Sequence, residues 1–262
     1  MVSKNLLWHI PRTGGSYINS CLTRLCNRFP KRYQFVRIGH EFCRHKQKDL
    51  FETYSVDDLG NRSPYTWEDW DDCYKFTAAR DPLQRLIGTY FWQEMYSPET
   101  RGVKPHIVKR RDWDKVLERW KNWRKTCAKY GISDIKSFLD NYKAFYYGEV
   151  HVQPQELEQI DSKTRDNSHV NFLGLFPQWW FVCDQNKKIL LDKVVKTRDI
   201  DRFLRARFNL KATKRATHGH SGDDYLSYTS KQNRKDIYEI YKADYQIFNF
   251  DTEINNATTN QK

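Results

Sequence analysis

The sequence predicts a three-layer α/β fold with a central, mostly parallel sheet flanked by helices. Short apolar runs that suit buried strands occur at 4–10, 33–38 and 74–79. The first and third of these runs lead directly into segments with helical spacing, at 16–29 and 82–90. Strands that alternate with helices in this way are typical of a parallel sheet covered on both faces.

The segments after the first and third strands carry clear helix signals. Pro30 ends a pattern in which apolar residues recur at steps of four, three and four: Ile18, Leu22, Leu25 and Phe29. In the second segment, Asp81 is placed to cap a helix whose first residue is Pro82. Each predicted strand–helix junction also carries an arginine.

The remainder of the chain continues the mixture of helices and strands. Residues 176–197 are expected to form two strands around a turn at Asp184, and Ser133 is expected to cap a helix. Helical spacing predicts further helices at 113–130, 199–208 and 231–248. No internal repeat is visible, so we expect one domain over 1–262 with a frayed tail at about 251–262.

The charge balance indicates an anionic partner. The chain has 45 Lys and Arg against 33 Asp and Glu, a net charge of +12, and the cations recur throughout. A nucleotide, an acidic polysaccharide, nucleic acid or an anionic membrane surface would each satisfy that charge.

The 6 cysteines are scattered without a C-x-x-C pair or a cluster with histidine, so we expect free thiols and no metal site.

The sequence contains no signal for membrane insertion or export. No apolar run approaches the roughly 20 residues of a transmembrane helix. The first residues, MVSKNLLWHIP, lack the apolar core and the cleavage site of a signal peptide. We therefore expect the chain, as written, to be cytoplasmic.

The sequence HIPRTGG, residues 9–15, is the first candidate site. A glycine-containing turn between a strand and a helix directs backbone N–H groups and the positive end of the helix dipole at one point, where a phosphate or sulfate can bind. Arg12, Thr13 and Ser16 add side-chain donors. The loop lacks the G-x-x-x-x-G-K-[ST] pattern, since its cation precedes the glycines. A nucleotide kinase, which shares this P-loop-like layout, is therefore the disfavoured alternative.

Four segments together resemble the sulfotransferases. HIPRTGGS at 9–16 and RDPLQRL at 80–86 resemble the paired nucleotide-binding motifs of that family, most closely the membrane-anchored carbohydrate sulfotransferases of the heparan sulfate 2-O-sulfotransferase type. GEVHVQPQ at 148–155 resembles the family's H-x-x-P-Q segment, and IYKADYQIFNF at 240–250 resembles its closing helix. The four segments follow one another in the family's order.

The resemblance implies an enzyme that moves the sulfuryl group of PAPS (3′-phosphoadenosine 5′-phosphosulfate) to a carbohydrate hydroxyl by in-line displacement, leaving PAP and using no metal. Arg12 takes the place of the family's loop lysine and would stabilise charge on the bridging oxygen. Arg80 would bind the 3′-phosphate. The other contacts expected around the 5′-phosphosulfate are Thr13, Gly14, Gly15, Ser16 and Tyr17.

One position departs from the family's pattern. A serine that shares the 3′-phosphate usually follows the second-motif arginine by eight residues, but Gly88 stands there. Thr89 is the neighbouring candidate, although one step along a helix turns a side chain by about 100°. In the family a basic loop before the final helix closes over the nucleotide. The candidates on that loop are Lys214, Arg215 and Thr217. The same segment is equally well interpreted as a plain basic surface loop.

The acceptor hydroxyl needs a base, and histidine has the right intrinsic pKa. His40 follows the second strand at the carboxyl edge where open α/β sheets build their sites, and its Gly-His pair resembles the catalytic histidine region of the 2-O-sulfotransferase type. His151 is the alternative base, whereas His9 is interpreted as structural. Acceptor contacts are expected from Glu149, Gln153 and Gln155.

Other functions explain less of the sequence. A nucleic-acid-binding protein would account for the charge of +12 and for 15% aromatic residues, but not for the paired strand–loop–helix junctions, so we expect no nucleic-acid partner. The acceptor is expected to be a hydroxyl-bearing glycan, either neutral or anionic, with a small metabolite or a peptide tyrosine as alternatives. Secretory relatives carry an N-terminal anchor, so the alternative location is the Golgi lumen if such an anchor has been trimmed.

Overall fold

The computed structural model describes residues 3–39, 71–95, 97–98, 113–152, 172–210 and 227–251. The chain groups into two compact units, and each is considered by itself. The first unit comprises Met1–Asp81, Pro177–His218 and Ala243–Phe250. The second comprises Pro82–Phe176, Gly219–Lys242 and Asp251–Lys262. The expectation of a single domain stays a prediction.

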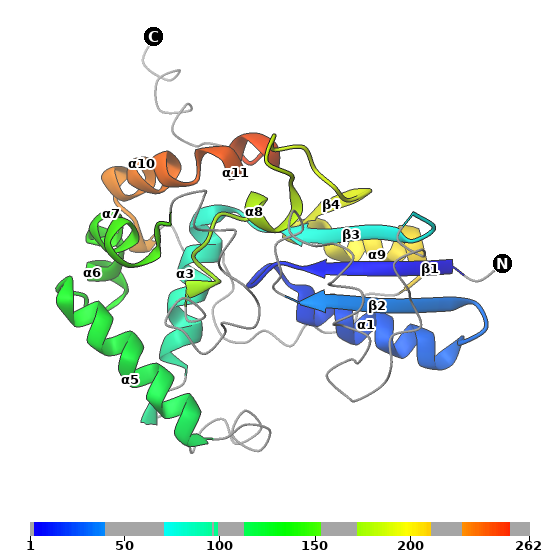
Figure 1. The fold of residues 1–262 in the computed structure, drawn as a ribbon, viewed down its shortest axis with the longest axis horizontal. Helices are drawn as coiled ribbons and strands as arrows, with labels where there is room; N and C mark the ends of the chain where they lie inside the picture. The colour runs from blue at the N-terminus through cyan, green and yellow to red at the C-terminus, as the bar shows by residue number, and fades with distance from the viewer. Residues whose placement is uncertain are drawn as a thin grey trace, which may run out of the picture. The chain divides into compact units, whose positions relative to one another are not determined.

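A four-stranded parallel sheet in the order β2-β1-β3-β4 forms the centre of the first unit (Figure 1). Its strands are β1 (Ser3–His9), β2 (Tyr33–Gly39), β3 (Tyr74–Ala79) and β4 (Lys193–Lys196). In the register of the sheet, Leu7 pairs with Arg37 on one side and with Phe76 on the other. Because all the pairs are parallel, the four carboxyl ends lie at one edge of the sheet, which is where open α/β folds place their ligands.

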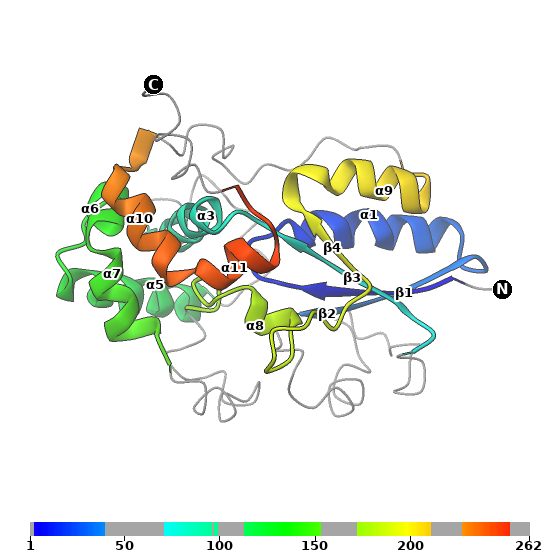
Figure 2. The same ribbon diagram turned by 90° about the horizontal axis from the view of Figure 1, so that it is seen from above.

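Helices cover both faces of this sheet. In Figure 2, α1 (Gly15–Arg28) and α9 (Ile200–Phe208) lie side by side on one face, and the short α8 (Trp179–Val182) lies on the other. The backbone N–H groups at the start of α8 bond to Asp244 of α11 (Lys242–Ile247). The predicted three-layer α/β fold with a parallel sheet is therefore confirmed.

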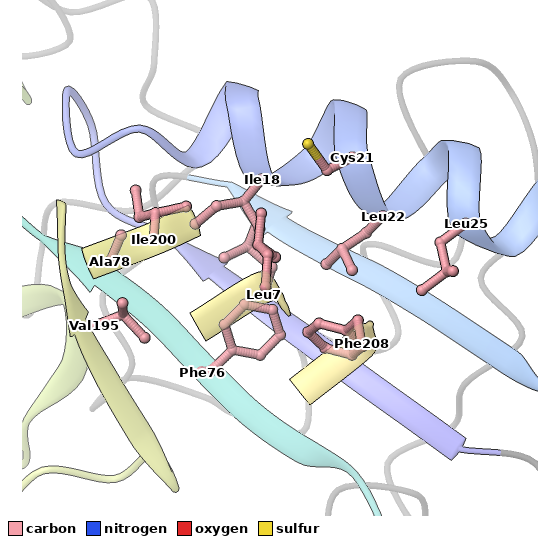
Figure 3. Close-up of a cluster of buried hydrophobic side chains, with 11 residues drawn as sticks. Leu7, Ile18, Cys21, Leu22, Leu25, Phe76, Ala78, Val195, Ile200 and Phe208 are labelled. Carbon is pink, nitrogen blue, oxygen red and sulfur yellow. The ribbon is translucent and has the colours of Figure 1, made fainter. Parts of the chain in front are cut away.

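The apolar core of the first unit lies between the sheet and the pair α1 and α9, as Figure 3 shows. The predicted stripe on α1 points into it, with Ile18, Leu22 and Leu25 all buried. Burial of each such side chain contributes roughly 1.5–3 kcal/mol. Phe29, expected in the same stripe, instead follows the helix and is 43% exposed. The strands and α9 supply the other large side chains of the cluster, among them Leu7, Phe76, Val195, Leu204 and Phe208.

The second unit is built from helices around an aromatic core. Its elements are α3 (Pro82–Glu94), α5 (Trp113–Lys129), α6 (Ile135–Asp140), α7 (Tyr142–Phe145), a π-helical turn at Tyr146–Val150 and α10 (Lys231–Ile240). Trp123 of α5 is fully buried, with its ring centroid 5.8 Å from that of Phe138 and 5.7 Å from that of Phe145. The helices predicted at 82–90 and 113–130 are confirmed.

One predicted strand in the second half of the chain is wrong in type. The first of the two strands expected within 176–197 is the helix α8, followed by one isolated antiparallel bridge between Cys183 and Ile189. The turn at Asp184 is present, because its Oδ1 accepts bonds from the N–H groups of Asn186 and Lys188, both at 2.9 Å. Only the second strand forms, as β4 at the edge of the sheet.

Two predicted helix boundaries also shift. Asp134, and not Ser133, caps α6, since its carboxylate accepts the Ser137 N–H at 2.7 Å in a reciprocal capping box. The helix expected over 231–248 is divided at Tyr241 into α10 and α11. The hydroxyl of that buried tyrosine donates to the carbonyl oxygen of Leu175 at 2.5 Å.

Free thiols are confirmed for the cysteines within the described residues: Cys21, Cys26, Cys73, Cys127 and Cys183. Burial raises the pKa of Cys127 and of Cys183 to about 12, so both thiols stay protonated at neutral pH. Across the described part of the chain, the structure contains no helix that is both long and apolar enough to cross a membrane.

Candidate functional site

The loop between β1 and α1 makes a tight left-handed turn. Arg12 has a φ of 68° and Gly14 a φ of 88°, and a left-handed conformation is uncommon for a residue with a side chain such as Arg12. Gly14 caps α1 without a side-chain hydrogen bond, and the first turn of the helix contains no acidic residue. Since a helix leaves the N–H groups of its first turn without intrahelical partners, this end of α1 suits an anion.

The start of α1 lies directly against the end of β1. A Cβ at Gly15 would lie 1.9 Å from Cδ2 of His9, so only glycine allows this approach. His9 is 5% exposed, and its Nδ1 accepts a bond from Nε of Arg37 at 3.2 Å. These contacts agree with the interpretation of His9 as a structural residue that shapes the loop.

The polar side chains of the loop and of the first turn of α1 differ in their burial and in their bonds. The Thr13 hydroxyl, 1% exposed, donates to the carbonyl oxygen of Ile10 at 2.9 Å and so closes the turn. The Tyr17 hydroxyl donates to Oδ1 of Asp201 at 2.7 Å. Ser16 is exposed and Arg12 is half-buried. Contact of Arg12 or Ser16 with a nucleotide stays a prediction.

The second motif begins where β3 ends, and its main chain is held by a distant side chain. Oε1 of Gln178 accepts a bond from the Arg80 N–H at 2.9 Å, and its Nε2 donates to the Arg80 carbonyl oxygen at 2.7 Å. Gln178 is fully buried, whereas Arg80 is half-buried. Sequence reasoning missed Gln178 because a single glutamine between a proline and two tryptophans carries no recognisable motif.

One hydroxyl joins the two motifs at the carboxyl edge of the sheet. Oγ1 of Thr197 lies 3.1 Å from the carbonyl oxygen of Thr13 and 3.0 Å from that of Ala79. Thr197 therefore ties the loop that carries Arg12 to the strand end that precedes Arg80. The structure thus brings the loop that carries Arg12 and the strand end that precedes Arg80 to one edge of the sheet. That the two arginines bind one nucleotide stays a prediction.

Gly88 and Thr89 lie on α3, in the second unit. The Thr89 hydroxyl is 1% exposed, within hydrogen-bonding distance of the carbonyl oxygens of Arg85 (2.9 Å) and Gly174 (3.1 Å). These bonds give Thr89 a packing role. Its contact with a nucleotide, like that of Gly88, stays a prediction.

Glu149 and His151 also belong to the second unit, at the π-helical turn and just after it. Oε1 of Glu149 accepts bonds from Nζ of Lys129 at 2.5 Å and from the Tyr130 hydroxyl at 3.0 Å. The hydrogen bond with Glu149 raises the pKa of Lys129. His151 is exposed, with its ring 5.4 Å from that of Tyr147. Acceptor contact or base catalysis by these residues stays a prediction.

The remaining candidates lie outside the described residues: His40, Gln153, Gln155, Lys214, Arg215 and Thr217. Their roles stay predictions. Within the described residues, no group of three or more His, Cys, Asp and Glu is arranged to hold a metal ion.

Comparison with known proteins adds an independent finding. The model of the sulfotransferase family matches residues 3–251, a span that includes both arginine-bearing motifs and the closing segment. No curated protein and no solved structure matches the chain. Because the family match covers nearly the whole sequence, from β1 to the residue after the closing segment, the chain belongs to the sulfotransferase family.

Proposed function

We propose that this sulfotransferase transfers the sulfuryl group of PAPS to a hydroxyl of a carbohydrate acceptor. The observation that carries the proposal is the pairing of two motifs through Thr197, which bonds to the main chain at Thr13 and at Ala79. One motif offers the start of α1, which has no side-chain cap, and the other offers Arg80. Two anion-binding ends at one sheet edge suit a nucleotide that carries both a 5′-phosphosulfate and a 3′-phosphate.

The donor groups of the first unit fit this nucleotide. The first turn of α1 and the exposed Ser16 would hold the 5′-phosphosulfate, in the absence of any acid in that turn. The guanidinium of Arg80 matches a phosphate with two parallel hydrogen bonds. The net charge of +12 adds long-range attraction for such a polyanion.

PAPS, when bound, supplies the sulfuryl group that the acceptor oxygen receives, and PAP is the leaving group. Arg12 would stabilise the negative charge that develops on the oxygen between sulfur and phosphorus, because its guanidinium stays charged at every working pH. The base would accept the proton of the acceptor hydroxyl from the side opposite the nucleotide. Direct in-line transfer of this kind needs no covalent enzyme intermediate.

Within this proposal His40 is the base and His151 is the alternative. Gly39 ends β2 and pairs with His9 of β1, so β2 ends beside the start of the proposed nucleotide loop. His40 is the next residue in the sequence. Glu149, Gln153 and Gln155 are the proposed acceptor contacts, and a screen of glycans with radiolabelled PAPS would identify the acceptor.

Calorimetric titration with PAP tests the nucleotide, and Arg12→Ala tests the chemistry. We expect saturable 1:1 binding of PAP, and a loss of turnover of about 10²–10³ in Arg12→Ala, the usual cost of removing one donor to a developing negative charge. Arg24→Ala, which removes an exposed arginine from α1, the helix that follows the loop, is the matched control and should keep its activity. Near-normal turnover in folded Arg12→Ala would refute the assignment of the loop.

The same assay assigns the base. His40→Ala should lower turnover by about 10²-fold or more, as expected for loss of a general base, with PAP affinity preserved. If His151→Ala shows this loss and His40→Ala does not, the base is His151.

A further inference from the structure

Asp244, in the segment that closes the fold, is a fully buried carboxylate. Its Oδ1 accepts the Trp179 N–H at 2.9 Å and its Oδ2 accepts the Gln178 N–H at 2.8 Å. A carboxylate is costly to bury unless backbone donors satisfy it in this way. Asp244 thereby fixes the main chain at the start of α8, including the backbone of Gln178.

Asp244 also faces the NH₂ end of the Gln178 amide. Nε2 of Gln178 lies 3.5 Å from Oδ2 of Asp244. An ionised carboxylate only accepts hydrogen bonds, so it favours the NH₂ end of the amide on its side. That orientation leaves Oε1 facing the Arg80 N–H at 2.9 Å while Nε2 donates to the Arg80 carbonyl oxygen at 2.7 Å. The reversed amide would place donor against donor and acceptor against acceptor.

The two bonds from Gln178 hold both main-chain polar groups of Arg80. On the preceding residue, the carbonyl oxygen of Ala79 accepts the Thr197 hydroxyl at 3.0 Å. The main chain where β3 ends is therefore held by two side chains from segments far along the sequence. A fixed Cα position matters for a long arginine, because a displacement of about 1 Å in a positioning group can cost about 10²-fold in a reaction.

We propose that Asp244 and Gln178 are positioning residues, which aim Arg80 at the 3′-phosphate of the nucleotide without touching the nucleotide themselves. This inference rests on the proposed function, in which Arg80 binds that phosphate. It assigns a role in binding to the buried aspartate of the closing segment, in addition to its role in folding.

The test compares PAP with adenosine 5′-monophosphate (AMP), which lacks the 3′-phosphate. The ratio of their dissociation constants measures how much the 3′-phosphate contributes to binding. Gln178→Met keeps the length of the side chain and removes both bonds to Arg80. We expect PAP affinity to fall about tenfold, at the lower end of the loss found when the partner that orients a ligand residue is removed, with AMP affinity changed by less than about twofold. Asp244→Asn, which sets an NH₂ group against the Gln178 N–H, should lower the ratio in the same direction.

Asn233→Leu is the matched control. Asn233 is 5% exposed, and its Nδ2 donates to the carbonyl oxygen of Leu139 at 3.2 Å and to Oδ1 of Asp140 at 3.1 Å, all within the second unit. Its Oδ1 also accepts the Ser230 N–H at 2.9 Å. This variant therefore loses three bonds of a buried amide, so its stability should fall at least as much as that of Gln178→Met while the PAP-to-AMP ratio stays at the wild-type value. Calorimetry reports the dissociation constant separately from the number of competent molecules, so partial unfolding does not imitate the expected result. If Gln178→Met does not fold, the shorter but polar Gln178→Asn gives the same measurement.

The outcomes separate the two proposals. If the wild-type protein prefers PAP and Gln178→Met keeps that preference, or loses affinity for PAP and AMP equally, the positioning role is overturned and the proposed function stands. If the wild-type protein does not distinguish PAP from AMP, both proposals are overturned. A selective loss of the 3′-phosphate contribution in Gln178→Met, absent in Asn233→Leu, supports the positioning role.

Discussion

The loop that carries Arg12 and the strand end at Arg80 lie at one edge of the sheet but are held in place by different means. The loop before α1 is shaped by neighbours in the sequence: a left-handed Gly14, a Gly15 packed against His9, and a Thr13 hydroxyl bonded to Ile10. The main chain at Arg80 is held by a glutamine 98 residues away. Local conformation thus shapes one half of the proposed nucleotide site, and long-range contacts shape the other. Added side-chain volume should damage the first half, and lost hydrogen bonds should damage the second.

Gly15→Ala is expected to have the largest effect, because it attacks the close approach of α1 to β1. The new Cβ would lie 1.9 Å from Cδ2 and 2.4 Å from Nε2 of His9, a ring that is itself buried and cannot swing into solvent. We expect a loss of about 3 kcal/mol in the free energy of unfolding, the upper part of the range for overpacked sites. Urea denaturation followed by circular dichroism measures this loss.

A second substitution identifies the cause. His9→Ala removes the ring that the new Cβ meets. The double variant should therefore lose less free energy of unfolding than the two single variants lose together. Effects that add to within about 0.5 kcal/mol would show that the two residues do not clash.

Gly14→Ala should cost less, about 2 kcal/mol, because its main effect is to force a side chain into the left-handed region. Its Cβ would also lie 2.8 Å from Cδ1 of Ile200, the far end of a side chain that can shift. Gly131 provides the comparison, since its φ is 68° and a Cβ there would meet nothing within 4 Å. Gly131→Ala should therefore show the backbone cost alone, about 1 kcal/mol. Equal losses in the two variants would mean that packing around Gly14 contributes nothing.

The contrast between local and long-range contacts also explains which parts were predictable. β1, β3 and α1 follow from apolar spacing within a few residues, and the left-handed turn follows from the glycines. The segment WWFV has the bulky apolar content of a strand, yet it forms α8 because Asp244, 65 residues beyond Trp179, accepts the N–H groups at its start. Gln178 could not be recognised as the partner of Arg80 for the same reason.

Within the site, the sequence indicated which residues are present but not which way their polar groups face. Thr13 and Tyr17 are expected to contact the nucleotide, which stays a prediction, and the structure shows their hydroxyls bonded to Ile10 and Asp201. A sequence motif specifies that a hydroxyl is near the loop. Whether a hydroxyl faces the ligand or the protein depends on the acceptors that folding brings within reach, and Asp201 comes from α9, 184 residues away.

Thr197→Val should have the smallest effect on stability and tests the bond that joins the two halves. Its hydroxyl has one hydrogen, which is shared between the carbonyl oxygens of Thr13 and Ala79. Removal of the hydroxyl should therefore lower the free energy of unfolding by about 1 kcal/mol, the net value of a typical hydrogen bond. Thr197→Ser keeps the hydroxyl and should keep most of that stability; unchanged stability in Thr197→Val, which keeps the methyl group and lacks only the hydroxyl, would show that the bond contributes nothing. Because Thr197 supports the loop as well as the end of β3, Thr197→Val should weaken the binding of AMP and of PAP together. That pattern differs from the selective loss expected for Gln178→Met, since a contact shared by the two motifs affects both ends of the nucleotide.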